Sequence, residues 1–202
     1  MKNYLIIFLV IGLLISNSYF ISQKSKYEEP LKDVHYQAVI HIGLGIDNSK
    51  KAFAELVTDI KGDYETVEHI VRMRNVLTYL EVTKLSAFNL SPYLRLSASE
   101  GHFSIREIDD FFRSIQRFME FEYTDFLLGD DTFTQDEIVY HLETFHQGLQ
   151  YLSKYLDLGL INQGDYETVK NHWHELMEEI ITFYPENTAF QQYFERNYTD
   201  EL

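Results

Sequence analysis

Apolar side chains recur every three or four positions over most of this chain, and this spacing constrains its fold more than any other feature. The clearest row consists of Ile138, Leu142, Phe145, Leu149, Leu152 and Leu156. Alternating steps of four and three place all of these side chains on one face of an α-helix. An isolated amphipathic helix is marginal in water, so several such helices must bury their apolar faces against one another.

Comparable rows occur along the rest of the chain, within residues 53–60, 67–80, 105–119, 169–183 and 187–197. Residues 34–46 fit a strand or a helix, and we favour a helix because no other segment offers a partner strand. The sequence therefore predicts an all-α fold in which residues 34–202 form one bundle of about six helices.

Several predicted helix boundaries have recognisable sequence patterns. Ser104 with Glu107, and Thr134 with Glu137, have the spacing of a capping box, in which each side chain satisfies a free backbone N–H of the first turn. Residues 159–164 are predicted to form a turn. Tyr184 and Pro185 are predicted to end the helix that precedes them, because the residue before a proline disfavours helical geometry.

The sequence GDYETV occurs twice, at residues 62–67 and at residues 164–169. We interpret both copies as helix junctions in which the glycine ends one helix and the aspartate caps the next. A duplicated ligand-binding loop is the alternative. The repeat also suggests two related helical hairpins packed in pseudo-symmetry.

The first 26 residues differ in composition from the rest of the chain. Residues 4–21 are almost wholly apolar and would span about 27 Å as a helix, just enough to cross the hydrocarbon core of a bilayer. Lys24 and Lys26 follow this segment. We predict an N-terminal membrane anchor over residues 1–26 that contacts the bilayer through residues 4–21, then a linker over residues 27–33 in which Pro30 discourages a continuous helix.

A cleaved signal peptide is the alternative interpretation of this segment, with Lys2 at its start and Ser16 to Ser18 supplying small residues near a cleavage site. The protein would then be secreted. If the segment is retained, the short stretch that precedes it favours a single-pass topology with the bundle outside the cytoplasm.

The charge distribution excludes some partners and favours others. Residues 27–202 contain 14 basic and 32 acidic residues, a net charge of −18. Such a surface repels nucleic-acid phosphates and favours a cationic peptide or protein. Tyrosines predicted to lie on this acidic surface are Tyr27, Tyr36, Tyr64, Tyr123, Tyr166, Tyr193 and Tyr198. The chain has no cysteine, which excludes disulfides, thiol nucleophiles and thiolate-bound metals.

One histidine cluster lies in the segment with the clearest helical pattern. Glu143 and His146 form a Glu-x-x-His pair, which di-iron bundles use to offer two ligands from one helix face, and His141 lies nearby. A complete di-iron site needs a second such pair, and the chain has none. The favoured interpretation places these side chains at the edge of the buried stripe, and we predict no cofactor.

His172 and His174 form the other cluster. His174, Glu175 and Glu178 approach the zinc-protease pattern, which requires a second histidine where this chain has Glu178. His172 and His174 are two positions apart and point in different directions on a helix. Helix surface positions are therefore favoured over a zinc site.

Residues 152–177 also contain the sequence LDLGLI followed by Tyr166 and Glu167. This short stretch resembles the helix–Gly-Leu-Ile–helix pattern of SHOCT-type oligomerisation segments. The pattern is general to helical hairpins and contains no active site, so the resemblance implies nothing about activity.

Three functional hypotheses follow. The first is a non-enzymatic, membrane-tethered helical module that binds a protein or cationic peptide. The second is a metal-dependent hydrolase or oxidase that uses Glu143, His146, His141, His172 or His174 as ligands. The third is an oligomeric structural component of an envelope complex.

Overall fold

The protein is helical throughout the part of the chain that the computed structural model describes, which is residues 2–62, 66–94, 106–129 and 132–198. These residues form eight helices and contain no strand. Six of the helices have eleven residues or more, and the other two are single short segments of six residues. The predicted all-α bundle is confirmed.

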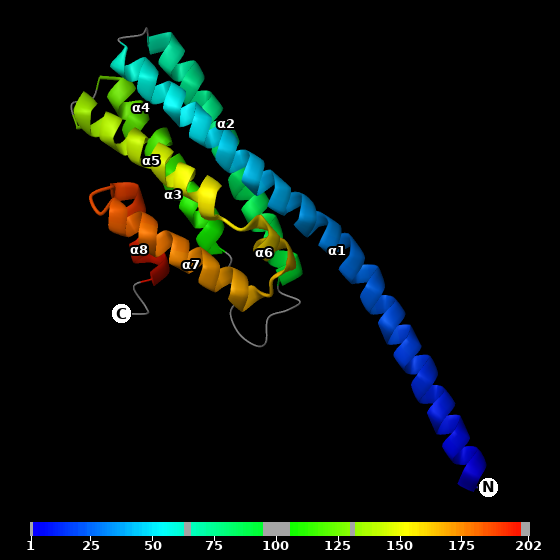
Figure 1. The fold of residues 1–202 in the computed structure, drawn as a ribbon. Coiled ribbons are helices and arrows are strands. Elements are labelled where there is room, and N and C mark those ends of the chain that lie inside the picture. Colours follow the sequence, from blue (N-terminus) through cyan, green and yellow to red (C-terminus); the bar gives the residue numbers. More distant parts are fainter. Residues whose placement is uncertain (1, 63–65, 95–105, 130–131, 199–202) are drawn as a thin grey trace.

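Helix α1 (Lys2–Lys61) is a single helix of 60 residues that extends from the bundle as a rod (Figure 1). It passes through residues 27–33, so the prediction that the helix is interrupted there is wrong. Pro30 lies inside the helix and is exposed. A proline inside a helix removes one N–H donor and crowds the carbonyl group four residues earlier, and here the helix continues on both sides despite this local cost. Residues 34–46, whose sequence fits either a strand or a helix, belong to this helix.

The predicted membrane anchor at residues 4–21 lies in the first third of α1, where most side chains are outside the described residues. Among the residues that the structure does describe, no helix carries an apolar stretch long enough to cross a bilayer.

Helix α2 (Thr66–Leu94) returns antiparallel to the second half of α1 (Figure 1). Arg72 of α2 binds Asp59 of α1 through Nε at 3.0 Å and also pairs with Glu55. Asp59 is nearly buried, so its pairing with Arg72 satisfies a carboxylate that would otherwise be costly at this position. The pairing links the beginning of α2 to the end of α1.

Helices α3 (Arg106–Glu120), α4 (Glu122–Leu127) and α5 (Gln135–Tyr155) complete the first part of the bundle. The capping box predicted at Thr134 and Glu137 is confirmed, with each residue bonding the backbone N–H of the other. Ser104, the first residue of the other predicted capping box, lies outside the described residues.

Helices α6 (Leu158–Gln163), α7 (Tyr166–Phe183) and α8 (Thr188–Tyr198) follow. The turn predicted at residues 159–164 is wrong, because Asp157 accepts a hydrogen bond from Leu160 N and begins the short helix α6. The predicted end of the next helix is confirmed, since α7 stops before Tyr184 and Pro185.

The core is rich in aromatic rings contributed by distant parts of the chain. Phe111 of α3 lies against Trp173 of α7 at 5.8 Å between centroids, and against Phe190 and Tyr193 of α8 at 5.5 Å each. Phe145 of α5 joins this cluster through Phe190 at 5.6 Å. Edge and offset contacts of this kind add to the free energy gained by burying apolar surface.

The two GDYETV copies lie at helix junctions. In the second copy, Asp165 accepts a hydrogen bond from Thr168 N at 2.9 Å and caps α7 as predicted. In the first copy, residues 63–65 lie outside the described residues. The first junction follows a helix of 60 residues and the second follows one of six, so the hairpins they join differ greatly in length.

Candidate functional site

An exposed aromatic cluster lies along the second half of α5, where it runs antiparallel to the second half of α7. Tyr151 and Tyr155 are one turn apart on α5, with ring centroids 4.6 Å apart, and Phe183 lies 6.4 Å from Tyr151. Tyr184 follows at 6.3 Å from Phe183. Tyr155 is 47% exposed and Phe183 is 62% exposed, so solvent reaches a large part of this cluster.

Acidic side chains border these rings. The Tyr151 hydroxyl donates a hydrogen bond to Glu179 Oε2 at 3.1 Å. Glu175, Glu179 and Phe183 occupy successive turns on one face of α7, and Glu178 is adjacent and exposed. Burial and the bond to Glu179 both raise the pKa of Tyr151, which keeps its hydroxyl protonated as the donor.

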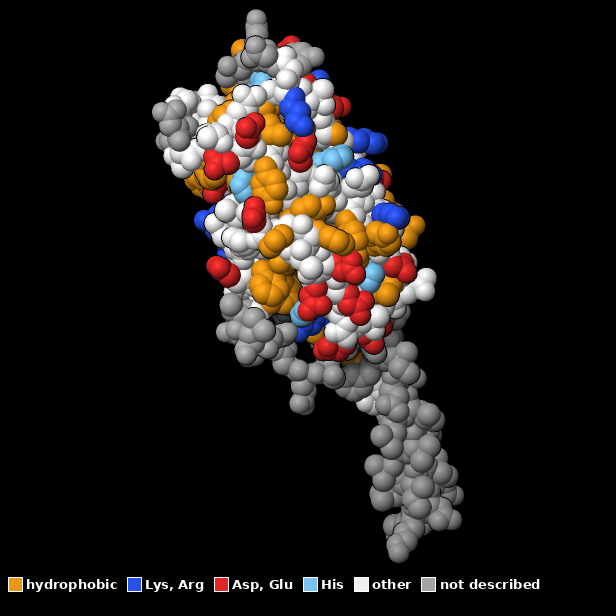
Figure 2. Space-filling view, turned by 60° about the vertical axis from the view of Figure 1, so that its left-hand side comes forward, with side chains coloured by type: hydrophobic (Ala, Val, Ile, Leu, Met, Phe, Trp, Pro, Cys, Tyr) orange, Lys and Arg blue, Asp and Glu red, His pale blue; other side chains and the backbone are white. Residues whose placement is uncertain are grey.

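Charges on α7 are strongly asymmetric. The helix carries four glutamates, Glu167, Glu175, Glu178 and Glu179, and one lysine, Lys170. Figure 2 shows acidic side chains gathered near the end of the molecule from which the rod extends, with hydrophobic side chains beside them. The aromatic–acidic face is the name we give to Tyr151, Tyr155, Phe183, Tyr184, Glu175, Glu178 and Glu179.

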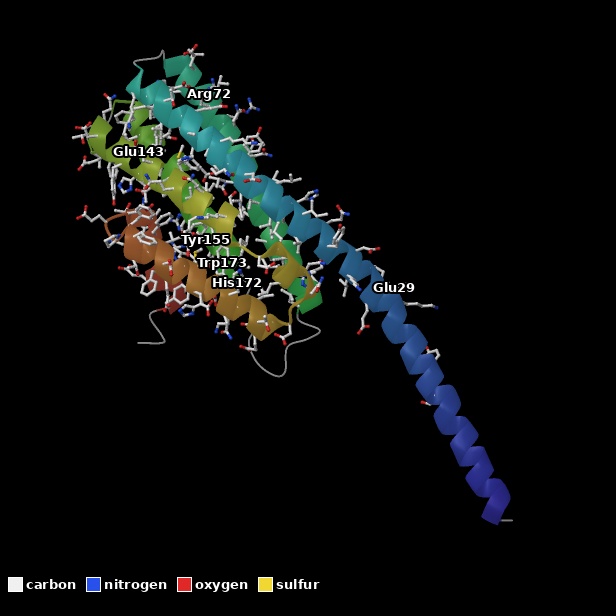
Figure 3. The ribbon with its side chains drawn as sticks, in the orientation of Figure 1. Glu29, Arg72, Glu143, Tyr155, His172 and Trp173 are labelled. Carbon is white, nitrogen blue, oxygen red and sulfur yellow. The ribbon has the colours of Figure 1, made fainter. Side chains whose placement is uncertain are left out.

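A cation already lies on this face. Lys154 Nζ sits 4.6 Å from the centroid of the Tyr155 ring, which is within the range of a cation–π interaction. Tyr155 lies at the end of α5 in Figure 3. The ring is thus accessible to an ammonium group.

An apolar groove of about 300 Å³ lies nearby between α1, α5 and α6. Ile40, Leu44, Leu152, Leu156 and Leu158 form most of its wall. At its edge Asp47 accepts hydrogen bonds from Ser153 at 2.7 Å and from Lys50 at 2.9 Å. The bond from Ser153, followed by the bond from Lys50, lowers the pKa of Asp47 and keeps this carboxylate charged.

The predicted metal ligands Glu143 and His146 both face α1. Glu143 pairs with Lys61 at 2.5 Å, and His146 Nδ1 lies 2.9 Å from the backbone carbonyl oxygen of Lys50. A ring nitrogen that contacts a carbonyl oxygen does so as an N–H donor and offers that position no lone pair for a metal. Both side chains therefore help to attach α5 to α1.

His141 lies on a different face of α5 from Glu143 and His146. Its ring is buried among three other rings. The distances between ring centroids are 4.7 Å to Phe118, 6.2 Å to Phe133 and 5.4 Å to Tyr140. Burial lowers the pKa of His141, and nearby Glu137 partly opposes this effect. The structure thus separates His141 from the Glu-x-x-His pair.

His172 and His174 likewise have separate partners. His172 Nε2 accepts a hydrogen bond from Asp157 N at 3.1 Å and so helps to hold the start of α6 (Figure 3). His174 Nε2 lies 3.1 Å from Glu178 Oε1, and its ring packs on Tyr198 at 4.5 Å. Across the described residues, no three His, Asp or Glu side chains are grouped as metal ligands.

Comparison with known protein families, with curated protein sequences and with solved structures finds no match to this chain.

The aromatic–acidic face was not predicted from the sequence, although an acidic, tyrosine-rich surface was predicted in general. Of the tyrosines predicted to be exposed, Tyr123, Tyr193 and Tyr198 are buried. Tyr151 and Tyr155 are not among the tyrosines predicted to be exposed. Their spacing of four residues, beside the buried Leu152, was the available indication that both lie on one edge of the helix.

Proposed function

We propose that this protein is a non-enzymatic interaction module, tethered to a membrane by residues 4–21, that binds a cationic peptide segment on its aromatic–acidic face. The observation that carries the proposal is the combination of exposed Tyr155 and Phe183 rings with the row of glutamates on α7. Such a face offers two kinds of attraction to a lysine or arginine side chain.

Both attractions are physically distinct. Carboxylates attract a cation over a Debye length of about 10 Å at 0.1 M salt. Aromatic rings attract it at short range and also bury its methylene chain. Lys154 on Tyr155 provides an internal example of the short-range contact. A cationic segment that carries aliphatic residues between its charges would satisfy both the rings and the glutamates.

The rod formed by α1 supports the tethered arrangement. A helix that runs without interruption from residue 21 to His35 would hold the bundle about 20 Å from the anchor. Binding would then take place close to the bilayer, where a tethered module is concentrated. We place the bundle outside the cytoplasm, and protease accessibility of intact cells tests that topology.

Binding is tested with the full chain in detergent micelles and a fluorescent peptide of alternating Lys and Leu as the probe. We expect saturable binding that weakens several-fold between about 0.1 M and about 1 M NaCl, because exposed charges are screened. A peptide of alternating Glu and Leu serves as the charge control. Binding that ignores salt, or that favours the acidic peptide, contradicts the proposal.

Variants locate the binding face. Tyr155→Ala combined with Phe183→Ala, and separately Glu175→Gln combined with Glu179→Gln, should each weaken binding several-fold. Phe88→Ala on α2 is the matched control, because Phe88 is 60% exposed and lies on another helix. Equal losses from the control and from the two double variants would show that the peptide binds elsewhere.

A further inference from the structure

A polar hollow of about 260 Å³ lies where the first turns of α8 meet the end of α3 and the start of α4. It is separate from the aromatic–acidic face, which belongs to α5 and α7. Its polar lining consists of Ser114, Arg117, Glu122, Thr188 and Gln192. The volume is near the lower end of ligand pockets, about 300–1,000 Å³, so only a small molecule fits.

Two polar atoms of the lining have no hydrogen-bond partner among the residues that the structure describes. Ser114 is 4% exposed, and its buried hydroxyl makes no hydrogen bond. One carboxyl oxygen of Glu122, Oε2, is also buried and makes no hydrogen bond. Buried polar atoms are nearly always hydrogen-bonded, because an unpaired one loses its solvation without compensation. Two unpaired groups around one hollow indicate that a molecule in the hollow completes them.

The hollow is also lined by opposite charges that do not pair directly. Arg117 and Glu122 interact electrostatically, yet neither takes part in an ion pair among the described residues. Burial raises the pKa of Glu122, and a hydrogen bond from its own backbone N–H, followed by the Arg117 charge, opposes this effect. A guanidinium and a carboxyl group that face one space without touching leave room for a ligand that carries both charges.

The surroundings favour a particular orientation of that ligand. Thr188 is the first residue of α8, a helix of eleven residues whose N-terminal end carries a partial positive charge. This end supports Arg117 in attracting a carboxylate. Phe118 and Phe121 supply an apolar wall beside the charged groups.

We propose that this hollow binds a small zwitterion of the α-amino-acid class. Its carboxylate lies toward Arg117 and the start of α8, its ammonium group lies toward Glu122, and its side chain contacts Phe118 and Phe121. The Ser114 hydroxyl donates to the carboxylate or accepts from the ammonium group. An inorganic anion satisfies only Arg117, and a metal cation satisfies only Glu122, so the zwitterion fits the lining best.

The first test uses the unmodified full chain in detergent micelles and three matched probes: L-leucine, N-acetyl-L-leucine and L-leucine amide. Titration calorimetry and chemical-shift changes at α3 and α8 report binding. We expect L-leucine to bind, and each blocked probe to bind roughly tenfold or more weakly, because each loses one charge-assisted hydrogen bond. No binding of L-leucine, glycine or L-phenylalanine at millimolar concentration overturns the proposal, as does equal binding of the blocked probes.

The second test assigns each charge to its residue. Glu122→Gln should weaken the binding of L-leucine at least tenfold and leave the binding of N-acetyl-L-leucine unchanged, since that probe has no ammonium group. Arg117→Gln should weaken L-leucine and leave L-leucine amide unchanged. Arg74→Gln and Glu167→Gln are matched charge controls on the exposed surfaces of α2 and α7. If a variant loses binding of all three probes equally, the assignment of the two charges to Glu122 and Arg117 is overturned. The first test uses only the unmodified chain, so its result does not depend on whether a variant folds.

Discussion

Gly45 of α1 lies directly against Thr83 of α2. A Cβ atom at Gly45 would overlap the Thr83 hydroxyl and would lie 3.0 Å from Thr83 Cβ and 3.3 Å from its backbone Cα. Both residues are buried, and the Thr83 hydroxyl is held by the carbonyl oxygen of Tyr79 at 2.7 Å. The absence of a side chain at position 45 is therefore what lets the two longest helices approach each other here.

Gly45→Ala should destabilise the bundle by about 1–3 kcal/mol, the usual cost of overpacking a close helix contact. Thermal unfolding of the full chain in detergent, followed by circular dichroism, measures the change. Adding Thr83→Ala should recover part of the loss, because it removes the hydroxyl but leaves Cβ and the backbone in place.

Gly43→Ala is the matched control for this prediction. A Cβ at Gly43 meets only the flexible end of the Leu158 side chain, at 2.6 Å from Cδ1. Alanine also favours a helix interior by about 1 kcal/mol over glycine. Gly43→Ala should therefore be neutral or stabilising, and equal losses at positions 43 and 45 would show that the contact with Thr83 is not the cause.

Trp173, Tyr193 and Tyr198 form a buried chain of hydrogen bonds. Trp173 Nε1 donates to Tyr193 Oη at 3.0 Å, which in turn lies 3.1 Å from Tyr198 Oη. Tyr193→Phe leaves the indole N–H without an acceptor and should cost about 1–3 kcal/mol. Because the chain has a single tryptophan, its fluorescence reports unfolding at this position.

A double-variant cycle separates the hydrogen bond from the packing of the rings. Once Trp173→Phe has removed the donor, Tyr193→Phe should cost much less than it does in the unmodified chain. Equal costs in the two backgrounds would assign the whole effect of Tyr193→Phe to ring packing.

The sequence predicted helix type and several helix ends because those depend on local chemistry. The capping box of Thr134 and the cap of Asp165 were recognisable because a helix start uses nearby side chains. The continuity of α1 through Pro30 could not be recognised from the sequence, because whether a helix tolerates one proline depends on the stability that the rest of the helix contributes. Helix α6 could not be recognised either, because it is too short to show a hydrophobic period.

The candidate sites were harder to predict than the fold. The aromatic–acidic face needs Tyr151 of α5 and Glu179 of α7 to meet, and the polar hollow needs Glu122 of α4 and Thr188 of α8 to meet. No local pattern determines which helix faces become neighbours. The prediction that Glu143 and His146 bind a metal depends only on their spacing within one helix, and the structure gives both residues partners on α1.

Acid should destabilise the bundle partly through His35. This buried side chain of α1 donates from Nε2 to the carbonyl oxygen of Ile161 in α6 at 3.0 Å. Burial lowers the pKa of His35 from its ordinary value of 6.5, and hydrogen bonds with the backbone of Ile161 and Leu90 oppose this effect. The unfolded chain therefore binds the proton more readily than the folded one.

It follows that the contribution of His35 to the free energy of unfolding is fully present above pH 6.5 and is lost as the pH falls below that value. His35→Gln preserves an N–H donor and removes the titration, so its melting temperature should change less than that of the unmodified chain between about pH 7.5 and about pH 5. Buried carboxyls such as Asp109 contribute equally to both proteins and cancel in the comparison. Parallel pH curves for the two proteins would contradict this prediction.

The full chain should not retain stoichiometric zinc or iron after dialysis against weak chelator. The reason is geometric, because each histidine already has another contact. His146 contacts a backbone carbonyl oxygen on α1, the His141 ring is buried among aromatic rings, and His172 accepts a hydrogen bond from Asp157 N. A metal would have to break these contacts and reorient three side chains on two helices. Elemental analysis and the melting temperature with added Zn²⁺ measure retention. Bound metal that disappears in His146→Ala, but not in a control such as His41→Ala on the exposed side of α1, would revive the metal-dependent enzyme hypothesis.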